Sequence, residues 1–314
     1  MKKFLLKSLI FALLVFVLAL GLDRLICRGL LKMDDYRFQD YRAMLEGDMD
    51  HDVLIIGNSR AKSHYDTHVI DTLGHKDSFN IGIGGYPVNV QLMKYKLYAE
   101  HNRKPELIIH NMDYMTVRVF GDIRNQHESE QFFPLVYDRE MRKELRKWGY
   151  GFLELNVPLF RFFGYQQVIK NGLLEALHLK HYSSRPSYKG FLPEKGRWNG
   201  SELARMKPEN VVLSNEGKAL LEEFLAQCRA DSIWVVLVNS PLYAGAQQKL
   251  IGYDSARAYF EQIADKYDCL YLDYTDTLMC QDTSNFCVSV HLNAQAARQF
   301  SETLVEDLIS LNKL

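Results

Sequence analysis

Three groups of residues in this sequence could together transfer an acyl group. Ser59 follows the apolar run 53–56 and the small residue Gly57, so we expect it at the carboxyl end of a buried strand, where open α/β sheets place their active sites. His291, a candidate to take the serine proton, lies before the last predicted helix. Acyl transfer also needs hydrogen-bond donors for an oxyanion, and the glycine-rich segment 80–86 offers backbone N–H groups. The sequence therefore predicts nucleophilic serine chemistry.

Each of these residues also has a structural interpretation. A serine after a strand and a glycine can simply cap the next helix, and His291 can cap or pack at the start of the last one. Asn111 and Asp113 end another predicted strand and can be ordinary turn formers. Arg60 either binds an acidic substrate or pairs with an aspartate, and we favour the pairing.

The elements that must position these residues alternate between strand and helix. The predicted strands cover residues 53–56, 79–83, 106–111, 233–238 and 269–272, with helical patterns between most of them. Such alternation indicates α/β architecture, a mostly parallel sheet in a three-layer sandwich with helices on both faces. The stretch at about 115–210 breaks the rhythm and is predicted to be a helical insertion over the active site. Its excess of basic and aromatic residues forms either a groove for an anionic or sugar substrate or, as we favour, solvated charge over a small aromatic core.

The N-terminus differs in kind from the remainder of the chain. Three lysines in the first seven residues precede the uncharged apolar run 8–22, which predicts an N-terminal membrane anchor or export signal over 1–30. We favour an uncleaved anchor, followed by a linker over 31–50 and an α/β domain over 51–314. Lysines on the N-terminal side keep that end in the cytoplasm. The expected location is the inner (cytoplasmic) membrane, single-pass, with the C-terminal domain periplasmic or extracellular.

Charge and cysteine content constrain the partners and the compartment. With 38 basic and 39 acidic residues, the chain lacks the positive balance of a protein that binds nucleic acid through its phosphates. Cys280 and Cys287 bracket a short polar loop and, in an oxidising compartment, could form a disulfide. No cofactor and no metal site are expected, because the histidines do not form a metal-ligand spacing with any cysteine or carboxylate.

The motifs resemble those of the SGNH (GDSL) hydrolase superfamily over most of residues 52–312. Gly57-Asn58-Ser59-Arg60 is similar to the family's Gly-Asp-Ser-Leu block, with Ser59 matching the nucleophile. Gly85, five residues after Asn80, matches the glycine whose N–H joins that of Ser59 in the oxyanion hole, and His291 matches the base. The resemblance implies a flavodoxin-like SGNH fold.

Two positions depart from the family pattern. The third block, Gly-x-Asn-Asp, aligns with His110-Asn111-Met112-Asp113, so Met112 stands where the family has its oxyanion-hole asparagine. Asn111, one residue earlier, is the candidate oxyanion donor. The aspartate that orients the family's base corresponds to Val288. Asp282, Asp273 or a backbone carbonyl could orient His291 instead.

With its predicted anchor, the chain is most similar to exported, membrane-anchored SGNH-like proteins associated with polysaccharide O-acylation. That resemblance implies a serine esterase or O-acyltransferase acting on acyl groups, often acetyl, of a glycan or wall polymer. The reaction would pass through an acyl-Ser59 intermediate with His291 as base, with Arg60 and Asp113 as substrate-binding candidates. A membrane-bound O-acyltransferase is the expected partner class. The alternative is a catalytically impaired SGNH-fold scaffold or binding subunit of a polymer-modifying complex.

Overall fold

The structure, a computed structural model, describes residues 1–183 and 187–314. The chain forms two compact units, each built from two separate segments. Met1–Glu46 and Gly121–Pro186 make up what we call the N-terminal unit, and Gly47–Phe120 and Ser187–Leu314 make up the α/β unit. The predicted α/β class with a mostly parallel sheet is confirmed.

The α/β unit is built on a sheet of five parallel strands in the order β2-β1-β3-β5-β7. Their bounds are β1 Val53–Ile56, β2 Ser78–Asn80, β3 Leu107–Asn111, β5 Trp234–Asn239 and β7 Leu270–Asp273. β1 and β3 are buried along their whole length, as expected of apolar strands covered on both faces. Numbered within the sheet, this order is 2-1-3-4-5, which reverses direction between β1 and β3 and so places a binding site at the carboxyl ends of those strands.

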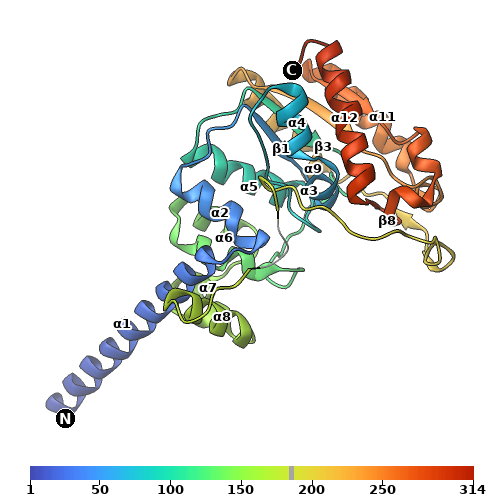
Figure 1. Ribbon diagram of the computed structural model, residues 1–314. Coiled ribbons are helices and arrows are strands. Elements are labelled where there is room, and N and C mark those ends of the chain that lie inside the picture. The colour runs from blue at the N-terminus through green and yellow to red at the C-terminus, as the bar shows by residue number, and fades with distance from the viewer. Residues whose placement is uncertain (184–186) are drawn as a thin grey trace. The chain divides into compact units, whose positions relative to one another are not determined.

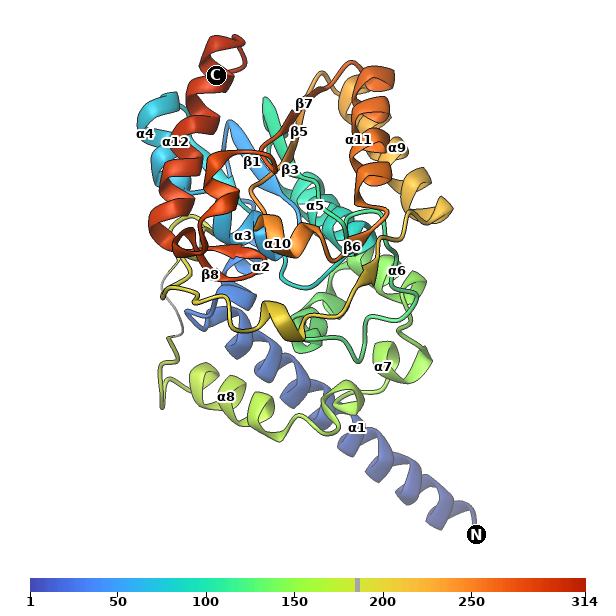
Figure 2. The same ribbon diagram turned by 90° about the vertical axis from the view of Figure 1, so that its right-hand side faces the viewer.

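Helices cover both faces of this sheet (Figures 1 and 2). α3 (Ser59–His64), α4 (Thr67–Gly74) and α12 (Ala294–Ser310) lie on one face, and α5 (Val88–His101), α9 (Asn215–Ala230) and α11 (Tyr253–Tyr267) lie on the other. α12 packs on α3 and α4, with Ala297, Phe300, Leu304 and Leu308 buried in the core that contains Val53 and Ile55. Those four residues recur at helical spacing on one side of α12, so its apolar stripe faces the sheet.

Shorter elements complete the α/β unit. They are η3 (Leu203–Arg205), α10 (Ala244–Gln247), η4 (Leu278–Gln281), η5 (Thr283–Asn285), the parallel pair β4 (Glu209–Asn210) and β6 (Leu250–Ile251), and the antiparallel pair β8 (Phe286–Val288) and β9 (His291–Leu292).

The N-terminal unit is helical and includes residues 31–46 of the segment predicted as a linker. Its elements are α1 (Lys2–Lys32), α2 (Tyr36–Glu46), η1 (Ser129–Tyr137), α6 (Arg139–Lys147), α7 (Phe152–Asn156), η2 (Phe160–Phe162) and α8 (Gln166–Ala176). α2 buries Phe38, Tyr41 and Met44, so 36–46 packs as a helix within this unit. The predicted insertion is divided, because 121–186 belongs to this unit whereas 187–210 belongs to the α/β unit.

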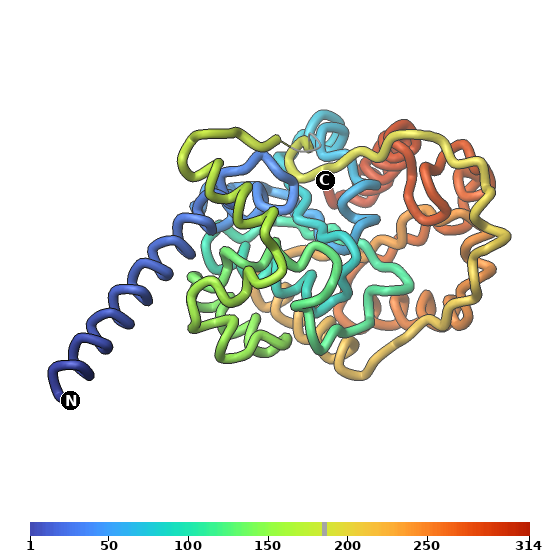
Figure 3. The backbone as a smooth tube through the Cα atoms, turned by 90° about the horizontal axis from the view of Figure 1, so that it is seen from below, coloured from blue at the N-terminus to red at the C-terminus, as the bar shows by residue number. Residues whose placement is uncertain are grey.

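α1 is one unbroken helix that is long and apolar enough to cross a membrane (Figure 3). Every residue from Met1 to Leu18 is exposed, whereas Ile26, Cys27 and Leu30 are buried. The buried half crosses α8 closely, since a Cβ on Gly29 would lie 1.8 Å from the carbonyl oxygen of Gly172. Glycine at this crossing therefore allows the two helix backbones to touch.

His110, at the end of β3, makes the stability of the fold depend on pH. The ring is fully buried, its Nε2 lies 3.1 Å from Oε1 of Gln91, and burial lowers its pKa to about 3. In the unfolded chain the same histidine takes up a proton near pH 6.5. Protonation therefore favours the unfolded chain, and the free energy of unfolding decreases as pH falls below that value. Between pH 7 and pH 5 the expected loss in unfolding free energy is about 2 kcal/mol.

Urea unfolding of the full chain at the two pH values measures this loss. His110→Gln should show a loss about 2 kcal/mol smaller than the unaltered protein. The matched control His127→Gln, at an exposed position, should keep the full loss. Equal pH dependence in all three proteins would contradict the assignment of His110 as a buried neutral histidine.

Candidate active site

A turn that only glycine can make brings the chain from β1 to Ser59. Gly57 has φ +141°, and a Cβ there would lie 2.8 Å from the Cβ of Ala61 and 2.9 Å from the Cβ of Asn111. Asn58 then caps α3, its side-chain oxygen accepting from the N–H of Arg60 at 3.0 Å. Ser59 is therefore the first residue of a helix at the carboxyl end of β1, half-buried and open to one side.

Ser59 and His291 meet although 232 residues separate them. The Nε2 of His291 lies 2.8 Å from the Oγ of Ser59. His291 begins β9, and two residues later Asn293 caps α12 by accepting from the N–H of Ala296. Burial lowers the pKa of His291, against an opposing effect of the Glu194 charge. The imidazole is therefore neutral near pH 7 and can accept the serine proton.

The glycine turn after β2 lies beside Ser59. The N–H of Ile83 donates to the carbonyl of Gly57 at 2.9 Å, and a Cβ on Gly84 would be 3.9 Å from that of Ser59. Gly85 has φ +77°, and an added Cβ there would meet no atom of the described residues within 4 Å. The backbone at Gly84 and Gly85 thus borders open space next to the nucleophile, where the predicted oxyanion donors belong.

Asn111 does not take the predicted oxyanion role. Its side chain is fully buried, and its Oδ1 accepts from the hydroxyl of Tyr65 at 2.8 Å and from that of Ser240 at 2.7 Å. Its Nδ2 is enclosed by protein and has no hydrogen-bond partner among the residues that the structure describes. The amide is held inside the scaffold by these two hydroxyls, so it presents no donor to a substrate.

Arg60 and Asp113 are not substrate-binding residues either. Both side chains are buried, and Nη1 of Arg60 lies 3.8 Å from Oδ2 of Asp113. Arg60 also donates to the carbonyl of Ser240, and Asn58 donates to Asp113. The two charges compensate each other beneath the site, as burial of charge requires, so the pairing interpretation is correct.

His64 is a positioning residue that sequence reasoning missed. The N–H of Leu292 donates to its Nε2 at 3.0 Å, so Nδ1 carries the proton and donates to the Oγ of Ser240 at 3.0 Å. Ser240 in turn donates to Asn111. Burial lowers the pKa of His64 well below its usual value, so the ring stays neutral. This chain of hydrogen bonds connects Leu292, the residue after His291, to Asn111 at the end of β3.

One sequence signal was available for part of this network. Ser240 follows β5 directly, as other candidate residues follow β1 and β3, so the rule that polar residues gather at strand ends would have included it. His64 had no such signal, because a histidine on a short helix reads equally well as surface or core.

Neither predicted carboxylate orients His291. Asp282 is exposed and caps η5 by accepting from the N–H of Ser284 at 2.8 Å, and Asp273 accepts from the Nε of Arg257 at 2.8 Å. Asp282 thus caps its own turn and Asp273 pairs with Arg257, and among the described residues neither carboxylate makes a hydrogen bond to His291.

Glu194 is the acidic residue whose charge acts most strongly on His291. It raises the pKa of the imidazole, opposing the effect of burial. Its carbonyl accepts from the N–H of Ala294 at 2.8 Å, and the N–H of Leu192 donates to the carbonyl of Lys62. The segment 191–198 is thereby fixed between α3 and the start of α12, which flank the site. Glu194 lies within the stretch predicted as an insertion, where no motif marked it.

The predicted disulfide between Cys280 and Cys287 is not formed. Cys280 is buried with its Sγ 3.3 Å from the carbonyl oxygen of Tyr274, whereas the Sγ of Cys287 lies 3.5 Å from that of His291. Each thiol is held by a different carbonyl, so the polar loop between them is shaped by η4 and η5 without a covalent link.

Comparisons with known proteins find only distant similarity. No protein-family profile matches the sequence, and no curated protein matches it. A solved structure provisionally described as a platelet activating factor from Streptococcus pneumonia aligns over 89% of this chain and 94% of its own, with 12% identity and a TM-score of 0.46. One provisionally described as an acylhydrolase from Bacteroides fragilis NCTC 9343 aligns over 89% and 96%, with 14% identity and a TM-score of 0.40. Similarity at this level carries no argument about activity, which rests on the geometry above.

The turn at Gly57 gives a direct test of how the nucleophile is positioned. Gly57→Ala should lower the free energy of unfolding by about 2 to 5 kcal/mol, since the strained φ and the two Cβ contacts add. Thermal unfolding of the full chain in detergent, followed by circular dichroism, measures the effect. Gly121→Ala is the matched control, because in the described part of the chain its Cβ would meet no atom within 4 Å. An equal effect of the two substitutions would contradict this account of the turn.

The charge of Glu194 should be visible in the pH dependence of catalysis. Glu194 favours protonated His291, so Glu194→Gln should lower the pKa of the base and move the acid limb of kcat/KM to lower pH. Hydrolysis of an activated acetyl ester across pH measures this shift. The control Glu202→Gln, at an exposed position in the α/β unit, should leave the limb in place. An unmoved limb in Glu194→Gln would exclude the predicted electrostatic coupling.

Proposed function

We propose that this protein is a membrane-tethered serine enzyme of acyl transfer, with Ser59 as nucleophile and His291 as base. The observation that carries the proposal is the 2.8 Å contact between Ser59 Oγ and the Nε2 of a histidine whose pKa is lowered. The open backbone of Gly84 and Gly85 beside Ser59 supports it. Nucleophile, base and oxyanion donors are the three components that acyl transfer through serine requires.

The reaction follows from these positions. His291 Nε2 takes the proton of Ser59 as Oγ attacks the carbonyl carbon of an ester, and the N–H groups of Ser59 and Gly85 stabilise the oxyanion. Collapse of this intermediate breaks the bond to the alcohol, which leaves with the proton from His291. An acyl-Ser59 remains, and a water molecule or an acceptor hydroxyl, deprotonated by the same imidazole, releases the acyl group.

For the substrate, we propose acyl groups, in particular acetyl, on a glycan or wall polymer. The resemblance of the Ser59, Gly85 and His291 blocks to SGNH hydrolases supports an ester substrate, and α1 supports action at a membrane. We further propose that the α/β unit lies on the periplasmic or extracellular side and works with a membrane-bound O-acyltransferase. Hydrolase and transferase differ here only in whether water or a sugar hydroxyl accepts the acyl group.

A fluorophosphonate probe tests the nucleophile. The full chain in detergent should be labelled at Ser59, Ser59→Ala should not be labelled, and His291→Ala should react at least about 100-fold more slowly because its base is lost. Ser201→Ala, which removes an exposed serine, is the control and should label normally. Circular dichroism establishes that each variant is folded.

The second candidate is a non-catalytic binding subunit with the same fold. The inward amide of Asn111 and the engagement of Asp282 in its own turn favour it, because both remove groups on which the family's catalysis depends. Folded protein that resists the probe, together with Ser59→Ala that retains function in cells, would support this candidate and exclude the enzyme.

A further inference from the structure

We propose that the N-terminal unit docks on the surface of the membrane that α1 crosses, with Phe160 and Phe163 inserted among the lipids at the interface. The proposal does not depend on acyl-transfer activity. It rests on three features of this unit, namely the place where the exposed part of α1 ends, the loop bound there, and the charges on the next turns of α1.

The exposed, apolar part of α1 ends at Asp23. The uncharged run Ser8–Leu22 extends to about 19 residues when Phe4, Leu5 and Leu6 are included and Lys7 snorkels, close to the ~20 that cross a bilayer. Asp23, the first acidic residue, is completely buried within the protein. The water–lipid interface therefore lies beside Asp23, and α1 continues from there into the N-terminal unit.

The loop between α7 and α8 is bound to that same residue. The N–H of Leu159 donates to Oδ2 of Asp23 at 2.7 Å, and Nη1 of Arg161 donates to the same oxygen at 2.9 Å. Nη2 of Arg161 also donates to the other oxygen, which makes the buried ion pair bidentate and fixes the orientation of the loop. Figure 2 shows this loop beside α1, between the labels of α7 and α8. The residues next to Leu159 are therefore held at the height of the interface.

Two phenylalanines on this loop are exposed. Phe163 is 90% exposed and Phe160 is 41% exposed. Further large apolar side chains are exposed on α7 and just after α8, namely Phe152, Leu153, Leu177 and Leu179. An aromatic side chain exposed to this degree in water is unfavourable, whereas aromatic and leucine side chains are preferred where a protein surface enters the headgroup region.

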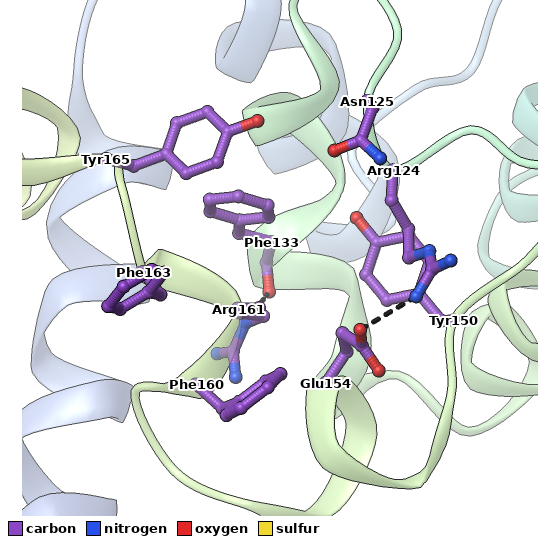
Figure 4. Close-up of a pocket in the computed structure, with 9 residues that line it drawn as sticks. All are labelled: Arg124, Asn125, Phe133, Tyr150, Glu154, Phe160, Arg161, Phe163 and Tyr165. Carbon is purple, nitrogen blue, oxygen red and sulfur yellow. Dashed lines mark hydrogen bonds and ion pairs between the residues drawn. The ribbon is translucent and has the colours of Figure 1, made fainter.

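The cavity beside these phenylalanines is not built for a charged ligand. It measures about 450 Å³ and is lined by aromatic rings together with Arg124, Arg161 and Glu154 (Figure 4). Arg124 is engaged by Glu154 at 2.9 Å and by Asp122, and Arg161 by Asp23. Both guanidinium groups are paired with carboxylates. The groups around this cavity that can contact a partner are therefore mainly the apolar rings.

Basic residues occupy the turns of α1 just beyond the interface. Arg24, Arg28 and Lys32 are all exposed and recur every four residues, so they share one side of the helix. Arg24 and Arg28 lie within about a turn and a half of Asp23, where positive charges meet lipid phosphates. Charge complementarity together with the exposed rings therefore favours a lipid surface as the occupant over an apolar surface of another protein.

Depth-dependent fluorescence quenching tests the docking with the full chain. Phe163→Trp is reconstituted in vesicles of phosphatidylcholine and phosphatidylglycerol whose acyl chains are brominated close to the headgroup. Leu278→Trp in the α/β unit is the matched control, since Leu278 is 91% exposed, and Leu18→Trp, on the exposed part of α1, reports insertion of that helix. The emission of the three native tryptophans is subtracted with the unaltered protein.

Brominated lipid should lower the emission of the tryptophan at position 163 at least about twofold and shift it to the blue, as for an indole at the interface. The tryptophan at position 278 should emit as in water. If the tryptophan at 18 is quenched but the one at 163 is quenched no more than the one at 278, the proposal is wrong. An unquenched tryptophan at 18 would also overturn it, because α1 would then not cross the bilayer. If the emission at position 163 shifts to the blue only after a membrane protein is added, the surface binds a protein partner, and the proposal is likewise overturned.

Discussion

The close approach of β1 and β3 at Gly57 is the constraint on which the site depends. An atom larger than hydrogen on this residue would meet the Cβ of Asn111 from β3 and that of Ala61 from α3. The absence of a side chain lets the backbone turn with φ +141° and start α3 immediately. Ser59 is consequently placed by the most buried part of the sheet, and its position does not rely on a mobile loop.

The groups around the nucleophile are organised by neutral hydrogen bonds more than by charge. His64, Ser240 and Asn111 form a chain of donors and acceptors in which each group has its direction determined by the next. Such a network holds β9, and with it His291, at a set distance from Ser59. The buried pair of Arg60 and Asp113 lies beneath it, so these two charges compensate each other. Burial lowers the pKa of His291, which suits a base that works at neutral pH.

The N-terminal unit depends on a different interaction, the buried ion pair between Asp23 and Arg161. Asp23 lies in the middle of a helix that is exposed before it and packed after it. A buried carboxylate is tolerated only when it is paired and hydrogen-bonded, and here Leu159 and Tyr137 supply the remaining donors. The ion pair thus joins the apolar segment of α1 to the helical unit that the remainder of α1 helps to form.

The sequence alone predicted the α/β class, which the structure confirms, and Ser59 and His291, which the structure brings within hydrogen-bond distance; it also predicted Gly85 as an oxyanion donor. Each depends on local patterns: an apolar run that ends at a glycine, a glycine-rich turn, and a histidine just before a capped helix. The roles of His64, Glu194 and Asn111 were decided by tertiary structure. Their partners lie far along the chain, and which polar atom meets which is determined by how β3, β5 and the segment 191–198 pack. The same reason explains why the spacing of Cys280 and Cys287 suggested a bridge that is not formed. Residue types and local spacing determine which chemistry is available, whereas packing of distant segments determines which groups are buried, paired or left open to a substrate.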